Sequence, residues 1–264
     1  MHKMIVPLIL AMLGLCLMID SSSASATEII AHRGASFYAP ENTLASFKLA
    51  WQMKADAAEL DIHLSKDGKI FVIHDASTAR TTGKDLSIKD SNSSEIRALD
   101  AGSYKGKEFE NERIPYLEEA LATIPRGRRM FVEIKCGQEV LPALQNAIKA
   151  SRKERQIRII GFDLDTIAAF KKLMQKIPVY WLQSKGNTDS YNMQLIESAR
   201  SRGIDGLDLN NTGLDKEFAD AAKAAGLKLY VWTVDDPVEA KRLVSLGVDG
   251  ITTNRPDLIR EKGL

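Results

Sequence analysis

The chain has 264 residues, of which 44% are hydrophobic and 27% are charged, and its formal net charge at pH 7 is +1. This composition is typical of a globular protein and is sufficient for one barrel or two small domains. A net charge so close to zero gives no electrostatic reason to expect nucleic acid or an anionic membrane surface as a partner.

The first 26 residues are typical of a secretory signal peptide, so we expect a mature domain over residues 27–264. A short basic start precedes an almost wholly apolar stretch from Met4 to Ile19, and Ala24-Ser25-Ala26 supplies the small-residue cleavage pattern. The alternative, a retained anchor, would need a spanning run of about 20 apolar residues. We therefore expect a periplasmic or secreted protein without stable membrane insertion after cleavage.

Eight apolar, β-rich segments alternate with helical patterns along the mature chain. The predicted strands are Glu28–Ala31, Ala57–Leu64, Met130–Lys135, Arg158–Phe162, Val179–Gln183, Gly206–Leu209, Lys228–Thr233 and Gly250–Thr253. Strand followed by helix, repeated eight times, indicates an α/β fold of the closed TIM (β/α)8 barrel type. An open doubly wound sheet is the alternative, but it usually carries a glycine-rich phosphate-binding motif after its first strand, which this sequence lacks.

One segment interrupts this alternation after the second strand. Asp67-Gly68 is typical of a hairpin turn, which predicts that "IFVIHD" extends the second strand as a partner. The following residues, about 75–113, carry turn formers and charges with little periodicity. A long segment after a barrel strand lies on the active face, so we expect this small insertion to cap the site.

Several predicted strands carry charged residues within apolar runs. Glu59 and Asp61 are two apart, as are Glu133 and Lys135, so the members of each pair share one face of a strand. Inward carboxylates are costly in a barrel unless they are paired or bind a cation. Half-solvated strands and a structural ion pair are the alternatives, but three converging acids suit a hard divalent cation.

The histidines of the mature chain lie in the first two strands and the extension of the second. His32 ends the first strand and His74 ends "FVIHD", and two imidazoles at strand ends can serve as acid and base. For His63 the preferred interpretation is simple packing. Arg33 offers a guanidinium that suits a phosphate group.

Two further residues stand where the barrel mouth is expected. Glu41 lies just before the first predicted helix, where it is free to join the carboxylates while Asn42 caps the helix. Trp232 ends the seventh strand, and its indole either packs in the core or shelters an apolar part of a substrate.

The motifs "AHRG", "PENT", "ELD", "VIHD…RTTG", "IPYLEEAL", "VEIK", "VWTV" and "GVDGITTNRPD" follow one another in this order. From Glu28 to Asp257 the chain thereby resembles the glycerophosphodiester phosphodiesterases. The resemblance implies a TIM barrel with a small inserted subdomain. It also implies hydrolysis of a small glycerophosphodiester to sn-glycerol 3-phosphate and an alcohol.

The resemblance further implies a role for each candidate residue. His32 and His74 become the acid and base pair. One divalent cation, Ca²⁺ or Mg²⁺, is held by Glu59, Asp61 and Glu133. The substrate is bound by a set in which Arg33 and Lys135 hold the phosphate, Glu41 organises the site and Trp232 faces the glycerol. Asn254 stands where the family commonly has Asp, and we expect this to affect the loop after the last strand.

Two other functions remain as alternatives. One is a barrel phospholipase that acts on lipid or lysolipid phosphodiesters, which should show an aromatic-rich rim. The insertion has only Tyr104 and Phe109 as aromatic residues, which favours a water-soluble substrate. The other is a phosphodiester-binding protein without turnover, which would lack one of the histidines or acids. The oligomeric state is not predicted.

Overall fold

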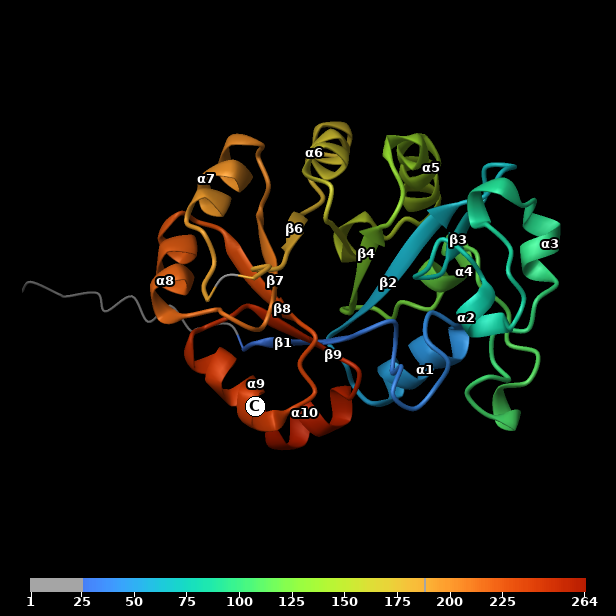
Figure 1. Cartoon of the computed structure of the whole chain (residues 1–264), viewed down its shortest axis with the longest axis horizontal. Helices are drawn as coiled ribbons and strands as arrows, with labels where there is room; N and C mark the ends of the chain where they lie inside the picture. The colour runs from blue at the N-terminus through green and yellow to red at the C-terminus, as the bar shows by residue number, and fades with distance from the viewer. Residues whose placement is uncertain (1–25, 188) are drawn as a thin grey trace, which may run out of the picture.

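Eight parallel strands close into a barrel in the computed structural model, which describes residues 26–187 and 189–264 (Figure 1). The strands lie in the order β1-β9-β8-β7-β6-β5-β4-β2, and pairing of β1 with β2 closes the ring. Their bounds are β1 Glu28–Ala31, β2 Ala57–Leu64, β4 Arg129–Ile134, β5 Ile157–Gly161, β6 Val179–Gln183, β7 Gly206–Asn210, β8 Lys228–Trp232 and β9 Gly250–Thr253. The predicted TIM barrel is confirmed, with strand ends shifted by a residue at most.

The predicted hairpin after the second strand is also present. Strand β3, Ile70–Val72, pairs antiparallel with β2, with Ile62 opposite Val72. The turn between them contains Gly68, whose φ of 77° lies in the left-handed region that favours glycine.

Helices follow the barrel strands and surround them, as Figure 1 shows for α5 to α8. Polar caps begin several of them: Thr43 accepts a hydrogen bond from the backbone of Ser46, and Asp215 accepts one from that of Phe218. The helices are α1 Leu44–Gln52, α4 Leu117–Ala122, α5 Leu141–Ser151, α6 Leu164–Leu173, α7 Gln194–Ser201, α8 Lys216–Ala224, α9 Pro237–Ser245 and α10 Pro256–Lys262. Short 3-10 turns η3 Gln138–Val140 and η4 Glu154–Gln156 flank α5.

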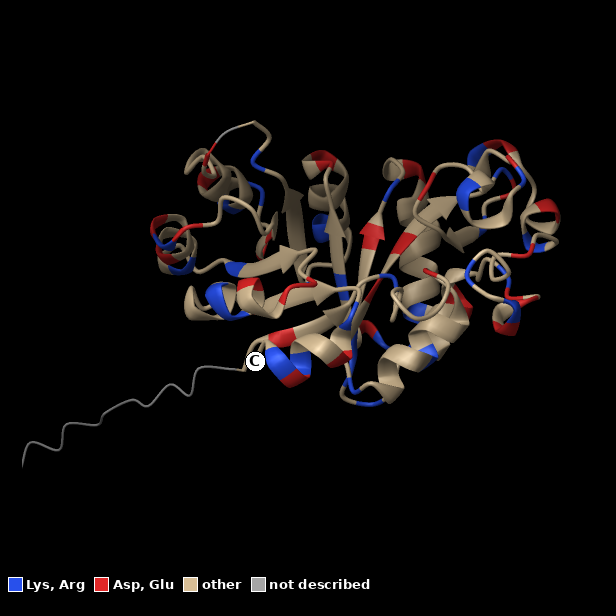
Figure 2. Cartoon of the chain, turned by 60° about the horizontal axis from the view of Figure 1, so that its bottom comes forward, with Lys and Arg blue, Asp and Glu red and all other residues tan. Residues whose placement is uncertain are grey.

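The two faces of the barrel strands form different layers. Outward residues such as Leu60 and Val132 pack against the helices in a large apolar core. Inward residues fill the barrel with a smaller cluster that includes Phe131 and Tyr230, whose ring centroids are 5.2 Å apart. Towards the carboxyl ends the inward positions of some strands become acidic, and Figure 2 shows acidic bands on two neighbouring strands. The site therefore lies at this end of the barrel.

The segment between β3 and α4 has a small core of its own. It contains α2 Ala79–Thr82, η1 Ile88–Asp90, α3 Ser93–Arg97 and η2 Lys107–Phe109. Phe71 of β3 joins this core, whose other buried residues are Ile73, Ile88, Ile96, Ala101 and Ile114. The predicted insertion, about 75–113, falls within this segment, which lies to one side of the barrel in Figure 1.

The insertion contacts the loop after β1 at the barrel mouth. The backbone of Glu41 donates a hydrogen bond to the hydroxyl of Tyr104 at 3.1 Å, and the ammonium of Lys105 donates to the carbonyl of Ser36 at 2.7 Å. The expected signal peptide lies outside the described residues, apart from its last position. Within those residues no helix is both long and apolar enough to cross a membrane.

Candidate active site

A cavity of about 250 Å³ opens at the carboxyl ends of the barrel strands. It is lined by polar and aromatic residues from the strand ends and the loops that follow them. These residues are His32, Arg33, Glu59, His74, Glu133, Lys135, Ile160, Phe162, Leu182, Asp208, Trp232, Thr233 and Thr252. Seven of the nine residues predicted for the site are therefore brought to one cavity.

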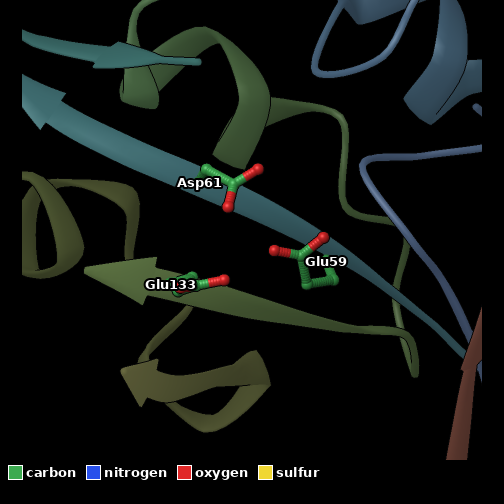
Figure 3. Close-up of side chains that lie close together, drawn as sticks. All are labelled: Glu59, Asp61 and Glu133. Atoms are coloured by element: carbon green, nitrogen blue, oxygen red, sulfur yellow. The ribbon is translucent and has the colours of Figure 1, made fainter. Parts of the chain in front are cut away.

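Three acids meet beside this cavity. Glu59 and Asp61 project from the inner face of β2, and Glu133 projects from β4, where it lies in register with Asp61. Their carboxylate oxygens lie within 4.8 Å of one another, and the side chains point together in Figure 3. All three residues are buried. The period of two along β2 and the pairing of β2 with β4 together create the cluster.

Two cationic side chains flank the three acids. The ammonium of Lys135 lies 2.7 Å from Glu133 and 3.3 Å from Asp61, and Arg33 Nε lies 3.4 Å from Asp61. Burial and the charge of Asp61 raise the pKa of Glu59 well above its usual range and that of Glu133 to about 7. Burial also opposes ionisation of Asp61, but the charges of Lys135 and Arg33 outweigh it and lower its pKa.

The residues of this cluster fit a divalent cation. Three ionised carboxylates beside two side-chain cations would leave one net negative charge, and this excess of negative charge contributes to the raised pKa of Glu59 and of Glu133. Glu59 Oε1 is buried and has no hydrogen-bond partner among the described residues, so a ligand atom is available. Carboxylate oxygens are the ligands that hard divalent cations prefer.

His32 is held by the loop after β9. Its Nδ1 lies 2.7 Å from Asn254 Oδ1, and the amide of Asn254 is fixed in turn because its Nδ2 donates to Asp235 at 2.6 Å. The oxygen of Asn254 therefore faces the ring, which places the proton on Nδ1 and leaves Nε2 as an acceptor. Burial and the charge of Arg33 lower the pKa of His32 to about 4, so the ring is neutral at pH 7.

The effect of Asn254 therefore reaches further than the sequence indicated. We expected this residue to influence the loop after the last strand, and it also contacts a candidate catalytic histidine. Asn254 and His32 are separated by 222 residues in the chain. Only the closure of the barrel by β9 against β1 brings them together.

His74 is held by the insertion. Its Nδ1 lies 2.7 Å from Asp75 Oδ1, and Arg80 donates to the other oxygen of Asp75 at 2.7 Å. Hydrogen bonding to Arg80, opposed by burial and reinforced by His74, lowers the pKa of Asp75 to about 2. A carboxylate anchored in this way fixes the orientation of the His74 ring.

The remaining predicted residues take different positions. Glu41 lies outside the acid cluster and does not line this cavity; its oxygens accept hydrogen bonds from Arg33 at 2.9 Å and Arg80 at 2.7 Å. It therefore links the loop after β1 to the insertion and orients Arg33. Trp232 lines the cavity, and its ring meets that of Phe162 edge to face with centroids 5.7 Å apart.

Sequence reasoning missed some residues of the site. Asp208 has the same signal as Glu59, a charged residue at an inward position of an apolar strand, but it has no charged neighbour two residues away. Asp75 and Arg80 gave no pattern that distinguished them from other charges of the insertion. His63 packs as expected, with its Nε2 donating to the carbonyl of His74 at 3.1 Å.

Comparison with known proteins identifies the family of this fold and site. A profile of the glycerophosphoryl diester phosphodiesterase family matches residues 32–258. The glycerophosphodiester phosphodiesterase of Caldanaerobacter subterraneus subsp. tengcongensis is 36% identical over 248 residues, covering 90% of this chain and 99% of that protein. A phosphodiesterase of Oleispira antarctica, solved in complex with the product sn-glycerol-3-phosphate, is 31% identical with a TM-score of 0.83, covering 89% of this chain and 96% of that one. The chain belongs to the glycerophosphoryl diester phosphodiesterase family.

Proposed function

We infer that the protein hydrolyses glycerophosphodiesters to sn-glycerol 3-phosphate and an alcohol. The observation that carries this inference is the meeting, in one cavity, of an acid cluster, two side-chain cations and two histidines with separate partners. These are the groups that metal-assisted phosphodiester hydrolysis needs. One relative described above is named for this reaction, and the other, a phosphodiesterase, was solved with the product sn-glycerol-3-phosphate.

Arg33 and Lys135 are placed to bind the phosphate group. Both line the cavity, and both are held by acids that lie beside it. Glu59, Asp61 and Glu133 would hold one divalent cation, for which we propose Ca²⁺ or Mg²⁺. Such a cation, when bound, supplies positive charge that offsets charge developing on the phosphoryl oxygens.

The two histidines are suited to opposite proton transfers. His32 is neutral and its Nε2 has no hydrogen-bond partner within residues 26–187 and 189–264, so it accepts a proton from the attacking hydroxyl group. His74 is oriented by the carboxylate of Asp75, 2.7 Å from its Nδ1, and we assign to it the donation of a proton to the departing alkoxide. The attacking hydroxyl belongs either to water or to the neighbouring glycerol hydroxyl, and a transient cyclic phosphate identifies the second route.

The direct test is release of sn-glycerol 3-phosphate from glycerophosphocholine by residues 27–264. The protein is assayed with EDTA and then with added calcium or magnesium. We expect metal-dependent release that is lost in His32→Ala and in His74→Ala. Absence of release by folded protein with every metal tested would contradict the proposed function.

A second substrate separates the roles of the histidines. Nitrophenolate is a leaving group that departs without protonation, so hydrolysis of a diester that carries it needs no proton donor. We expect His74→Ala to retain much more activity on this substrate than on glycerophosphocholine, whereas His32→Ala loses both activities. The reverse pattern would exchange the two roles.

One observation favours a second substrate class. Phe37, Tyr104 and Phe162 are exposed on loops around the mouth, with 45% to 52% of their surface accessible. An aromatic rim suits contact with an acyl chain, as in the lysolipid alternative. Turnover of lysophosphatidylcholine faster than glycerophosphocholine would favour that class.

We also propose that the protein is exported and that residues 1–26 are removed. The support is the apolar stretch followed by Ala24-Ser25-Ala26. N-terminal sequencing of the protein recovered from a periplasmic fraction should begin at Thr27. A start at Met1 in that protein would contradict cleavage.

A further inference from the structure

Asp208 is a buried carboxyl that faces the catalytic cavity from the side opposite the acid cluster. It lies on β7, in register with Leu182 of β6 and Tyr230 of β8, both of which belong to the inner layer of the barrel. The residue is 1% exposed and lines the cavity. Its side chain therefore points inward among largely apolar neighbours.

The carboxyl of Asp208 lacks the partners that the other inward acids have. Its Oδ1 is buried without a hydrogen-bond partner among the described residues. Burial and the charge of Glu133 raise its pKa well above its usual range. Asp208 is also absent from the three-acid cluster. A buried, unpaired carboxyl is costly, and an apolar residue at this inward position would avoid that cost. Its retention therefore indicates a ligand.

The wall around Asp208 suits the carbon skeleton of a small polyol. Ile160, Leu182 and Phe162 present apolar surface, and Trp232 is anchored by a hydrogen bond from its Nε1 to the carbonyl of Asp208 at 3.1 Å. Apolar surface with a few placed polar groups is the usual composition of a small-molecule site. Within this wall, the carboxyl of Asp208 is able to bind a hydroxyl group.

We propose that Asp208 is a specificity-determining residue that hydrogen-bonds a hydroxyl group of the substrate's glycerol half. The proposal rests on the proposed function. In either protonation state the carboxyl accepts a hydrogen bond from a hydroxyl. The glycerol half is common to all substrates of the class whereas the alcohol half varies, and a side chain as deeply buried as Asp208 suits recognition of the half that does not vary.

The test compares Asp208→Leu and Asp208→Asn with the wild type. The substrates are glycerophosphocholine and the ethyl ester of sn-glycerol 3-phosphate, which share the glycerol half and differ in the alcohol. We expect Asp208→Leu to lower kcat/KM by about 10- to 100-fold on both, the usual effect of one lost hydrogen bond to a buried hydroxyl. Asp208→Asn retains an acceptor oxygen and should recover most of this loss.

Direct binding separates glycerol recognition from phosphate binding. In calorimetry, Asp208→Leu should weaken the binding of sn-glycerol 3-phosphate and leave the binding of inorganic phosphate unchanged. Asp220→Asn, on the exposed face of α8, is the matched control and should behave as the wild type. Asp208→Leu should be folded, with a Tm at least that of the wild type, because it removes an unpaired buried carboxyl.

Other outcomes would overturn the assignment. A loss of kcat/KM confined to glycerophosphocholine would place Asp208 against the choline group. An equal loss of phosphate binding and of cation binding would place it among the metal ligands. Unchanged binding of sn-glycerol 3-phosphate would leave it without a role in recognition. A wild type that binds sn-glycerol 3-phosphate through Asp208 but hydrolyses neither diester would overturn the proposed function and leave this assignment standing.

Discussion

The half-buried imidazole of His32 should make the stability of the metal-free protein depend on pH. Its pKa is about 4 in the folded protein against 6.5 for an ordinary histidine, because burial and Arg33 disfavour the charged form. Between these two values the unfolded chain binds a proton that the folded chain does not. The free energy of unfolding therefore falls as the pH falls from 6.5 towards 4.

The size of this effect follows from the same two values. The full difference corresponds to about 3 kcal/mol, of which about 2 kcal/mol is lost between pH 7 and pH 5. Part of the ring faces the cavity, where water reduces the penalty, so we expect about 1–2 kcal/mol. His32→Asn is the matched variant, because its amide nitrogen can replace Nδ1 as the donor to Asn254 and does not titrate.

The assay is urea unfolding in EDTA at pH 7 and pH 5, for the wild type and His32→Asn. Other groups titrate in both proteins, so the difference between the two pH dependences isolates His32. We expect the wild type to lose about 1–2 kcal/mol more than the variant on acidification. Equal losses would mean that His32 is solvated like an ordinary histidine, and the argument for a neutral acceptor would fail.

Three further predictions concern the cation, the insertion and its core. Glu59→Gln should weaken calcium or magnesium binding at least about tenfold in calorimetry because it removes one anionic ligand; unchanged affinity would exclude it from the cage. Arg80→Met should lower kcat about 10- to 100-fold with little change in KM, because Arg80 orients His74 through Asp75; an effect on KM alone would contradict this. Ile96→Ala, fully buried in the insertion core, should lower the free energy of unfolding by about 2–4 kcal/mol in urea titrations, and a loss below about 1 kcal/mol would mean that this core contributes little.

Local sequence patterns determined most of the barrel. Strands such as Ala57–Leu64 are recognisable because β-rich apolar runs are bounded by turns and alternate with amphipathic helices, and these properties are local. The period of two along a strand is equally local, so Glu59 and Asp61 could be assigned to one face without a structure. The order of the motifs then indicated the family.

Tertiary structure alone decided which groups meet. The pairing register places Glu133 beside Asp61, and closure of the barrel brings Asn254 to His32. Glu41 pairs with two arginines at the rim. The local sequence pattern could not distinguish it from a member of the acid cluster. Asp208 likewise could not be recognised as unpaired, because whether a buried carboxyl has a partner depends on distant strands. Sequence fixes the face on which a side chain lies through local geometry, whereas its partners are set by contacts between segments far apart in the chain.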